Sequence, residues 1–535
     1  MVNEYTALTA DVVAGAANLT VANSTLNLNS AVTNLTAPLA AGDLVLVIQM
    51  QGAAIDQTNT AAYGNVTSYN SAGRYELAQV AAVPTATTIT LTCGLTNGYS
   101  AAGMVQVIRV PRYSTLALNV NTSLTASAWD GTTGGVLVVD VQTTTTLASG
   151  ATLDVSGKGF RGGAKLNTAG YAGVVNNLLY VSASNTNAEK GEGIAGSQAT
   201  YDGIGGRYGR GAAANGGGGG NSHNAAGGGG ANAGVGPWTG TGNPNRGTYV
   251  SGTGSSQVFS YDAAWNLESA NFASSASSGG GRGGYSYSAN NLNPATNAPN
   301  TTAWGGDYRQ NNGGLGGRPL NAITGRLFLG GGGGAGNAND GGGSGGATGG
   351  GLIILNAGGA LTVSDATNQA IADGAGAAPT TATDAAGGGG SIFLNVAGGI
   401  STLGLSAKGG AGGNFSINWD EAEGPGGGGG GGAVAYTTGT PVLALAGGAN
   451  GTCASVPMTT AFPPNGSTIG GAGTSSTFSF VTAQCITADV TTTLSGPATA
   501  PAGSYVYYTA TTTNTSPAGG NAALADVTRV VHPQA

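Results

Sequence analysis

The chain has 535 residues, of which 103 are glycine and only 7% are charged, and its formal net charge is -7. Globular proteins usually have about 7% glycine and about 25% charged residues, so the surface here must be built from Thr, Ser, Asn, Gly and Ala. The 40% of apolar residues suffices for hydrophobic cores, which excludes a wholly disordered chain, and the lack of any Lys/Arg cluster excludes nucleic acid as a partner.

Residues 1–128 are predicted to form an N-terminal β domain. Short runs of β-branched and other apolar residues occur at 44–48, 88–92 and 105–110, separated by Gly, Asn and Pro. This pattern is typical of short strands. The alanine-rich patches between them are too brief and too poorly capped to predict helices.

Residues 129–450 are predicted to form a glycine-rich β-repeat domain, because a glycine pair followed by a short apolar run occurs four times. The pairs are Gly134-Gly135, Gly350-Gly351, Gly389-Gly390 and Gly431-Gly432. The last three pairs start about 40 residues apart, a spacing that is found in stacked repeats. Each repeat is predicted to form a strand, a turn, a second strand and a glycine loop, so we expect a β-solenoid-like architecture.

Long glycine runs fill a predicted insertion at about 164–330 and the regions around it. Gly/Ser tracts usually form flexible linkers. These runs, however, lie between apolar strands and are interrupted by aromatic residues that could act as contact points, namely Trp238, Trp265, Trp304 and Trp419. Extended glycine strands with three residues per turn could instead pack side by side as polyglycine II, since only a hydrogen side chain permits that contact. We expect such packing for at least some runs, with the linker as the alternative.

Residues 451–485 form a Pro/Ser/Gly-rich linker that contains two of the three cysteines, Cys453 and Cys485, while the third is Cys93. A Cys453–Cys485 disulfide would close this loop and stabilise the fold by roughly 3 kcal/mol. Three unrelated buried thiols are the alternative. The cysteine spacing does not resemble that of a zinc site.

Residues 486–535 are predicted to form part of an immunoglobulin-like sandwich. Threonine-rich runs at 487–495 and 504–515 read as two or three strands. A complete sandwich needs about seven strands and about 100 residues. We therefore expect the module to be cut off here, continued in a longer chain or completed by a strand from another subunit.

One acidic cluster, Asp420, Glu421 and Glu423, lies next to Trp419 and could be a carboxylate pair beside a sugar-stacking ring. The glycine run that follows is poorly suited to holding catalytic carboxylates rigidly. A calcium site is the second interpretation and a solvated acidic turn is the third. Asp340 is a weaker calcium candidate, because the alternating acidic residues and the bidentate Glu of a calcium loop are missing around it.

The chain is not expected to be an enzyme, and calcium is the only cofactor that the sequence leaves open. Its two histidines, His223 and His532, lie in a glycine run and near the C-terminus, which argues against a Ser-His-Asp triad. No segment approaches the roughly 18 apolar residues of a membrane span, so membrane insertion is not expected. The Thr/Asn-rich, Lys-poor composition is typical of secreted surface proteins and predicts an extracellular or cell-surface location.

Residues 42–53, 105–113 and 128–163 together resemble the front end of large secreted surface proteins of Bacteroidetes. The segment from Ala488 resembles the repeated immunoglobulin-like modules of bacterial adhesins. The glycine-rich middle is similar in composition to the glycine-rich region of anaplastic lymphoma kinase. The resemblance to the surface proteins implies export by type IX secretion, followed by attachment to the cell surface or assembly into extracellular material.

These features favour an extracellular structural protein, a subunit of a self-assembling surface fibre or matrix. Strands and glycine segments would pack through their backbones, and the partners would be copies of the chain or neighbouring surface proteins. A single-chain adhesin or stalk that binds glycans or surfaces is the alternative. A carbohydrate-active β-helix enzyme is the third hypothesis.

Overall fold

The computed structural model confirms an all-β fold. Apart from the short helices α1 (Ser30–Thr33) and α2 (Gln198–Gly203) and the 3-10 turn η1 (Ala101–Gly103), the regular elements that it describes are strands. The structure describes residues 1–60, 62–167, 179–183, 188–221, 224–234, 279–288, 309–311, 313–318, 320–321, 325–338, 345–377, 385–415, 424–452, 467–479, 490–495 and 509–514.

The N-terminal residues fold into a six-stranded antiparallel sheet with the order β1-β8-β3-β6-β7-β2. Its strands are β1 (Glu4–Ala7), β2 (Asn18–Thr20), β3 (Leu44–Gln49), β6 (Tyr75–Thr85), β7 (Thr88–Leu91) and β8 (Val105–Val110), and a small pair consists of β4 (Ala54–Ile55) and β5 (Val66–Ser68). Strand β3 is buried on both faces. Leu46 packs into one hydrophobic core, and Val45 and Val47 pack into another.

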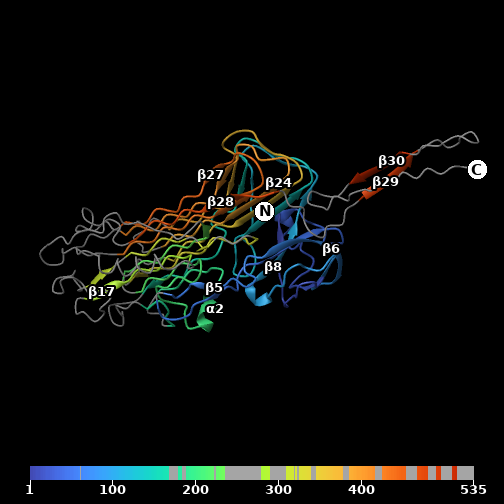
Figure 1. The fold of residues 1–535 in the computed structure, drawn as a ribbon. Helices are drawn as coiled ribbons and strands as arrows, with labels where there is room; N and C mark the ends of the chain where they lie inside the picture. Colours follow the sequence, from blue (N-terminus) through green and yellow to red (C-terminus); the bar gives the residue numbers. More distant parts are fainter. Residues whose placement is uncertain are drawn as a thin grey trace, which may run out of the picture.

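After this sheet the chain builds three parallel sheets, which we call the parallel stack (Figure 1). The six-stranded parallel sheet contains β9 (Arg112–Tyr113), β12 (Val136–Val141), β21 (Leu352–Ala357), β24 (Ser391–Val396), β26 (Ala433–Tyr436) and β28 (Thr474–Thr477). The three-stranded sheet contains β10 (Leu116–Leu118), β13 (Thr145–Leu147) and β22 (Leu361–Val363). The five-stranded sheet contains β11 (Ser123–Leu124), β14 (Thr152–Asp154), β23 (Gln369–Ile371), β25 (Gly404–Ser406) and β27 (Val442–Ala444). We call one passage of the chain through these sheets a coil.

The repeated apolar runs are strands of the six-stranded parallel sheet, and they are apolar throughout because both of their faces are buried. Val138 and Ile354 point toward the N-terminal sheet, in the same core as its β3 residues. Val139 and Leu355 point into the interior of the parallel stack. Burial on both faces removes the alternation of polar and apolar residues that a half-exposed strand would show.

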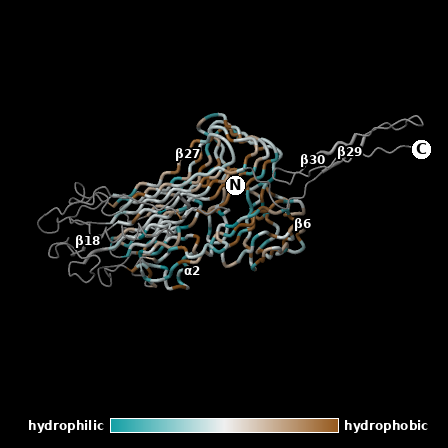
Figure 2. The backbone as a smooth tube through the Cα atoms, in the orientation of Figure 1, coloured by the Kyte–Doolittle hydropathy of each residue, from teal (hydrophilic) through white to brown (hydrophobic). Residues whose placement is uncertain are grey.

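Hydrogen bonds fix the N-terminal strand to this sheet. The Tyr5 hydroxyl donates to the Val136 carbonyl at 2.7 Å, and the Asn3 side-chain amide donates to the Val138 carbonyl at 2.7 Å. Figure 2 shows apolar residues gathered in the stack and the N-terminal sheet, whereas the glycine-rich region beside them is pale. The hydrophobic core therefore lies at the junction of the two parts.

The parallel stack begins before residue 128, the boundary that the sequence suggested for the N-terminal domain. Strands β9 to β11 already pair in parallel with β12 to β14 and form a short first coil. Their apolar residues are too few to predict a coil. The first coil does not begin with a glycine pair, so the repeat motif does not predict it.

The remaining strands form small pairs. They are β15 (Leu166–Asn167) with β20 (Asn337–Ala338), β16 (Ala233–Gly234) with β19 (Leu320–Asn321), β17 (Ser286–Ser288) with β18 (Arg309–Asn311), and β29 (Val490–Ser495) with β30 (Thr509–Asn514). The antiparallel β29-β30 pair projects from the body of the molecule (Figure 1). It matches two strands expected for the immunoglobulin-like module, whose other residues lie outside those described, so the sandwich stays a prediction.

Candidate functional site in the glycine bundle

Glycine-rich segments lead out of the coils and lie side by side, extending away from the parallel stack (Figure 1). We call this region the glycine bundle, and most of its residues are buried. Its segments are residues 159–163, 188–193, 216–221, 227–231, 279–284, 313–318, 328–335, 345–351, 372–376, 385–390, 407–413, 424–432, 445–451 and 467–473.

Backbone hydrogen bonds hold the bundle together in a repeating pattern. Along residues 217–221, successive N–H groups donate to three different neighbouring segments, and the same neighbour returns after three residues. The bonds run from Gly217 to Gly332, Gly218 to Gly281, Gly219 to Gly209, Gly220 to Ala335 and Asn221 to Gly284, with N···O distances of 2.9 to 3.0 Å. A period of three residues is that of an extended helix without internal hydrogen bonds, whose backbone groups all face neighbours.

Close backbone contacts leave no room for a side chain at the glycine positions of the bundle. A Cβ atom at Gly228 would lie 2.1 Å from the Gly281 carbonyl oxygen, and one at Gly334 would lie 1.9 Å from that of Gly218. Real Cβ atoms essentially never approach another heavy atom within 3.0 Å. The described glycine runs are therefore packed segments, and the linker interpretation does not apply to them.

The predicted glycine pairs lie where each coil leaves the bundle and enters the six-stranded parallel sheet. A Cβ atom at Gly390 would lie 1.8 Å from the Gly351 carbonyl oxygen, and one at Gly432 would lie 2.0 Å from that of Gly390. The same oxygens accept the first hydrogen bond of the next strand, from the N–H groups of Ser391 and Ala433 at 3.0 Å. We call this row, made of the second glycine of each pair and of Gly473 before β28, the glycine column. It runs through Gly135, Gly351, Gly390, Gly432 and Gly473.

The first glycine of each later pair contacts the end of a strand in the five-stranded sheet. Cβ atoms at these positions would lie 2.0 to 2.4 Å from the carbonyl oxygens that follow β23, β25 and β27, with Gly350 facing Ala372, Gly389 facing Ala407 and Gly431 facing Leu445. In the first pair the backbone conformation itself requires glycine, since φ is +98° at Gly134 and +77° at Gly135. The repeated motif thus marks the corner of each coil.

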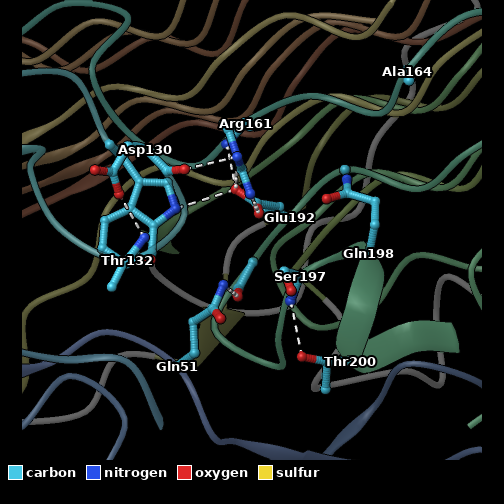
Figure 3. A network of polar contacts seen from close by, with 12 residues as sticks. Gln51, Asp130, Thr132, Arg161, Ala164, Glu192, Ser197, Gln198 and Thr200 are labelled. Carbon is cyan, nitrogen blue, oxygen red and sulfur yellow. Dashed lines mark hydrogen bonds and ion pairs between the residues drawn. The ribbon is translucent and has the colours of Figure 1, made fainter. Parts of the chain in front are cut away.

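The buried carboxylate of Glu192 connects the loop before β12 to the glycine bundle (Figure 3). Glu192 Oε2 accepts from Trp129 Nε1 at 3.2 Å and from Arg161 Nε at 3.0 Å, and its Oε1 lies 2.5 Å from Arg161 Nη2. Arg161 Nη1 also donates to the Asp130 carbonyl at 2.8 Å. The Trp129 ring packs edge-on against Phe160. The hydrogen bonds to Glu192 raise the pKa of Arg161. This network orients the loop that leads into β12.

A second charge, Lys190, is fully buried beside the bundle. Its Nζ donates to the carbonyl oxygens of Tyr180, Tyr208 and Gly209 at 2.8, 2.7 and 2.7 Å, and it lies 4.9 Å from the centre of the Tyr63 ring. Burial lowers the pKa of the Lys190 amine well below its ordinary value. The three carbonyls and the ring replace the water that an exposed ammonium would bind.

Two arginines beside the bundle also contact aromatic rings and backbone carbonyls. The Arg210 guanidinium lies 4.2 Å from the centre of the Tyr285 ring, and that of Arg282 lies 5.3 Å from the centre of the Tyr180 ring. Arg210 Nε also donates to the Gly283 carbonyl at 3.2 Å. Cations that stack on aromatic rings and donate to backbone carbonyls stabilise the side of a bundle that has few side chains of its own.

Polar side chains also form a ladder across the six-stranded parallel sheet. Asp140, Asn356 and Asn395 occupy the same register position in β12, β21 and β24. Asp140 Oδ1 accepts from Asn356 Nδ2 at 3.1 Å, Asn356 Oδ1 accepts from Asn395 Nδ2, and Arg112 Nε lies 3.4 Å from Asp140 Oδ2. Burial raises the pKa of Asp140 from 3.8 to about 6, although Arg112 and Asn356 act in the opposite direction.

Replacing Asp140 by Asn should change how stability depends on pH. Since the folded-state pKa of Asp140 is about 6 and its ordinary value is 3.8, the folded state binds more protons between these values, so stability is lost as pH rises through this window. We expect Asp140→Asn to remove that loss. The difference in unfolding free energy between variant and wild type should then grow by about 2 kcal/mol from pH 4 to pH 7. Urea unfolding at both pH values measures it, and an unchanged difference would contradict the assignment.

Most side chains that the sequence singled out lie outside the described residues. They are Trp238, Trp265, Trp304 and Trp419, the acidic residues Asp340, Asp420, Glu421 and Glu423, the cysteines Cys453 and Cys485, and the histidines His223 and His532. The calcium candidates among them stay predictions. Trp129, Glu192 and Lys190 make the contacts described above. Sequence reasoning missed these contacts because the partners are distant in the chain.

The predicted disulfide between Cys453 and Cys485 is wrong, because Cys93 forms a disulfide. The chain has three cysteines, so a bond at Cys93 uses one of the other two. The prediction relied on closeness in sequence. A disulfide requires Cα atoms within about 7 Å of each other in space, which a fold can provide between residues that are far apart in the chain.

The N-terminal sheet carries a shallow cavity of about 570 Å³. Its polar lining includes Asp11, Asn70, Ser71, Arg74, Asn97 and Ser100. The Glu76 carboxylate fixes the loop on one side of the cavity by accepting from the Thr96 and Asn97 N–H groups at 2.7 and 3.0 Å and from the Tyr99 hydroxyl at 2.9 Å. The cavity offers both donors and acceptors to a polar ligand.

Within the described residues, no group of three or more His, Cys, Asp and Glu side chains is placed to hold a metal ion. In the same residues, no helix has the length and apolar character needed to cross a membrane. The carboxylates of Glu4 and Glu192 are instead occupied by hydrogen bonds from neighbouring protein groups.

No protein-family model and no curated protein matches the chain. Among solved structures, the tailspike protein gp49 from Pseudomonas phage LKA1 is similar over 29% of this chain and 23% of its own, with 17% sequence identity and a TM-score of 0.14. The chain therefore spans less than a quarter of that protein. A TM-score this low supports no conclusion about the function of the chain.

Proposed function

We propose that the chain is an extracellular structural protein, a subunit of a self-assembling surface fibre or matrix. The observation that carries the proposal is the glycine column, in which the same backbone contact recurs from coil to coil. The repeat ends at β27 and β28, whose outer edges pair with no other strand in the described part of the chain. A repeat that ends on an open strand edge can be continued by another chain.

In this proposal the parallel stack is a β-solenoid and the glycine bundle is polyglycine II packing. Both are held mainly by backbone hydrogen bonds, each worth about 1 kcal/mol net, that act in parallel across many segments. Such an arrangement distributes a mechanical load over the whole cross-section. The proposal gives the chain no catalytic role, and its partners are copies of the chain or neighbouring surface proteins.

Two features support the extracellular part of the proposal. The disulfide at Cys93 is of a kind that persists in oxidising compartments and is rare in reducing ones. The low charge content leaves few Lys and Arg residues, where trypsin-like proteases cut. Export by type IX secretion, which the resemblance to Bacteroidetes surface proteins implies, belongs to the same proposal.

Negative-stain electron microscopy of native, cell-derived material, with the intact mass of the polypeptide measured alongside, tests the proposal. Regular fibres built from a chain of about 51.2 kDa are the expected result. Single particles, or a much heavier parent chain, would contradict the fibre subunit and favour a long adhesin.

A single-chain adhesin that binds glycans is the second candidate, and the cavity beside Arg74 favours it. Its mixed donors and acceptors suit the hydroxyl groups of a sugar. Glycan-array binding by the full chain, compared with Arg74→Ala, tests this function. Specific binding that the variant loses would support it, and absence of any binding would argue against it.

A further inference from the structure

The exposed apolar residues of the parallel stack gather at its two ends. At the end formed by the last coils, Val442 and Leu443 of β27 are 61% and 38% exposed, and Ile469 is 45% exposed. At the opposite end, Val120 is 61% exposed just before β11 of the first coil. Between these ends, the residues in register with Leu443 are buried in the core of the stack, namely Leu405, Ala370 and Leu153.

Among the residues that the structure describes, neither end strand has the usual protection of an open sheet edge. Natural edges are commonly blocked by charged residues, by proline within the strand or by a covering segment. The strands β27 (Val442–Ala444) and β11 (Ser123–Leu124) contain no charged residue and no proline. Within the ranges that the structure describes, each pairs with a strand on one side only.

The register of the five-stranded sheet shows what would fit on the open edge. One row across the sheet consists of Leu124, Leu153, Ala370, Leu405 and Leu443. The row is apolar at every position, and its first and last members are both leucine. A copy that placed its β11 beside β27 would set its Leu124 next to Leu443, which repeats the contact that Leu124 makes with Leu153 inside one chain.

We infer that a second copy of this chain docks head to tail on the parallel stack, with its β11 pairing in parallel with β27 of the first copy. The inference rests on the proposed function and names the two surfaces through which assembly would occur. Because the two surfaces differ, the contact is heterologous and leaves a free end on each copy. Assembly therefore propagates along the axis of the stack and produces a fibre rather than a closed dimer.

Charge does not oppose this contact. Strands β11 and β27 carry no charge, and the formal net charge of -7 is spread over 535 residues. The neighbouring edge strand β9 carries one charge, Arg112, which forms an ion pair with Asp140 of the same chain. A lysine placed on either edge would have to lose its hydration in the contact, which is the means by which natural edge strands avoid pairing.

Three variants of the full chain test the inference by sedimentation velocity and electron microscopy. One double variant blocks the β27 end and carries Val442→Lys and Leu443→Lys. A second double variant blocks the β11 end and carries Val120→Lys and Ser123→Lys. Leu28→Lys is the matched control, since Leu28 is 73% exposed on the N-terminal domain. All positions are exposed or partly exposed, and circular dichroism checks that each variant keeps the wild-type spectrum.

Each end variant should be monomeric alone, with a loss of at least tenfold in the fraction of assembled protein, while the control assembles like wild type. An equimolar mixture of the two end variants should form complexes of two copies and no fibres, because one functional contact remains. Fibres from wild type and from both end variants would overturn the inference and leave the proposed function standing. Absence of wild-type assembly would overturn the inference together with the proposed function.

Discussion

Gly390→Ala should lower the free energy of unfolding by at least about 3 kcal/mol, or prevent folding altogether. The new Cβ atom would lie 1.8 Å from the Gly351 carbonyl oxygen, and that oxygen already accepts the hydrogen bond of Ser391. Two coils would have to separate to make room, which breaks the backbone contact that the glycine column repeats. Thermal unfolding of the purified chain, together with the yield of folded protein, measures the effect.

Gly203→Ala is the matched control, because no atom lies within 4 Å of the position that its Cβ would take. This residue ends α2, so we expect a change of no more than about 1 kcal/mol, in the stabilising direction. Equal effects at Gly390 and Gly203 would contradict the steric account of the column. The comparison separates the cost of the close contact from the general effect of replacing glycine.

Lys190→Met should destabilise the chain by about 3 kcal/mol or more. Methionine matches the length of the lysine side chain but donates no hydrogen bond, so the carbonyl groups of Tyr180, Tyr208 and Gly209 would each lose the lysine donor and keep only a backbone N–H partner. A hydrogen bond contributes roughly 1 kcal/mol net, so the loss of three amounts to about 3 kcal/mol. A neutral amine still donates two of these bonds, so a loss should be seen across a wide range of pH.

Lys408→Met provides the control for this substitution. The Lys408 side chain is 51% exposed and forms an ion pair with Asp373 at 3.4 Å, a surface contact worth at most about 1 kcal/mol. Midpoints of urea unfolding for the two variants should therefore differ clearly. A Lys190 variant as stable as the Lys408 variant would show that the buried ammonium is dispensable.

The glycine pairs made the repeated part of the fold predictable from sequence. A pair such as Gly389-Gly390 before a short apolar run predicts a strand, and the structure has β24 there. The sequence did not reveal that the N-terminal sheet covers the outer face of the stack. Burial of Val138 by β3 depends on contacts between elements that no local pattern records.

The polar contacts beside the bundle were much harder to predict. Lys190 and Arg210 lie in glycine-rich sequence and resemble solvated surface charges, yet both are fully buried. Their partners are carbonyls and rings that the fold brings from other segments. The rings that Arg210 contacts, Tyr180 and Tyr285, are 30 and 75 residues away in the sequence, so no local pattern indicates these contacts.

Hydrogen exchange of the glycine segments tests the central claim most directly, because the account depends on buried and hydrogen-bonded glycine backbone. Mass spectrometry of the full chain can follow residues 386–390 and 426–432, whose N–H groups donate to neighbouring segments. We predict that these amides exchange as slowly as those of β21 and β24. Exchange within seconds, at the rate of an unstructured peptide, would show that the runs are flexible linkers and would contradict the account.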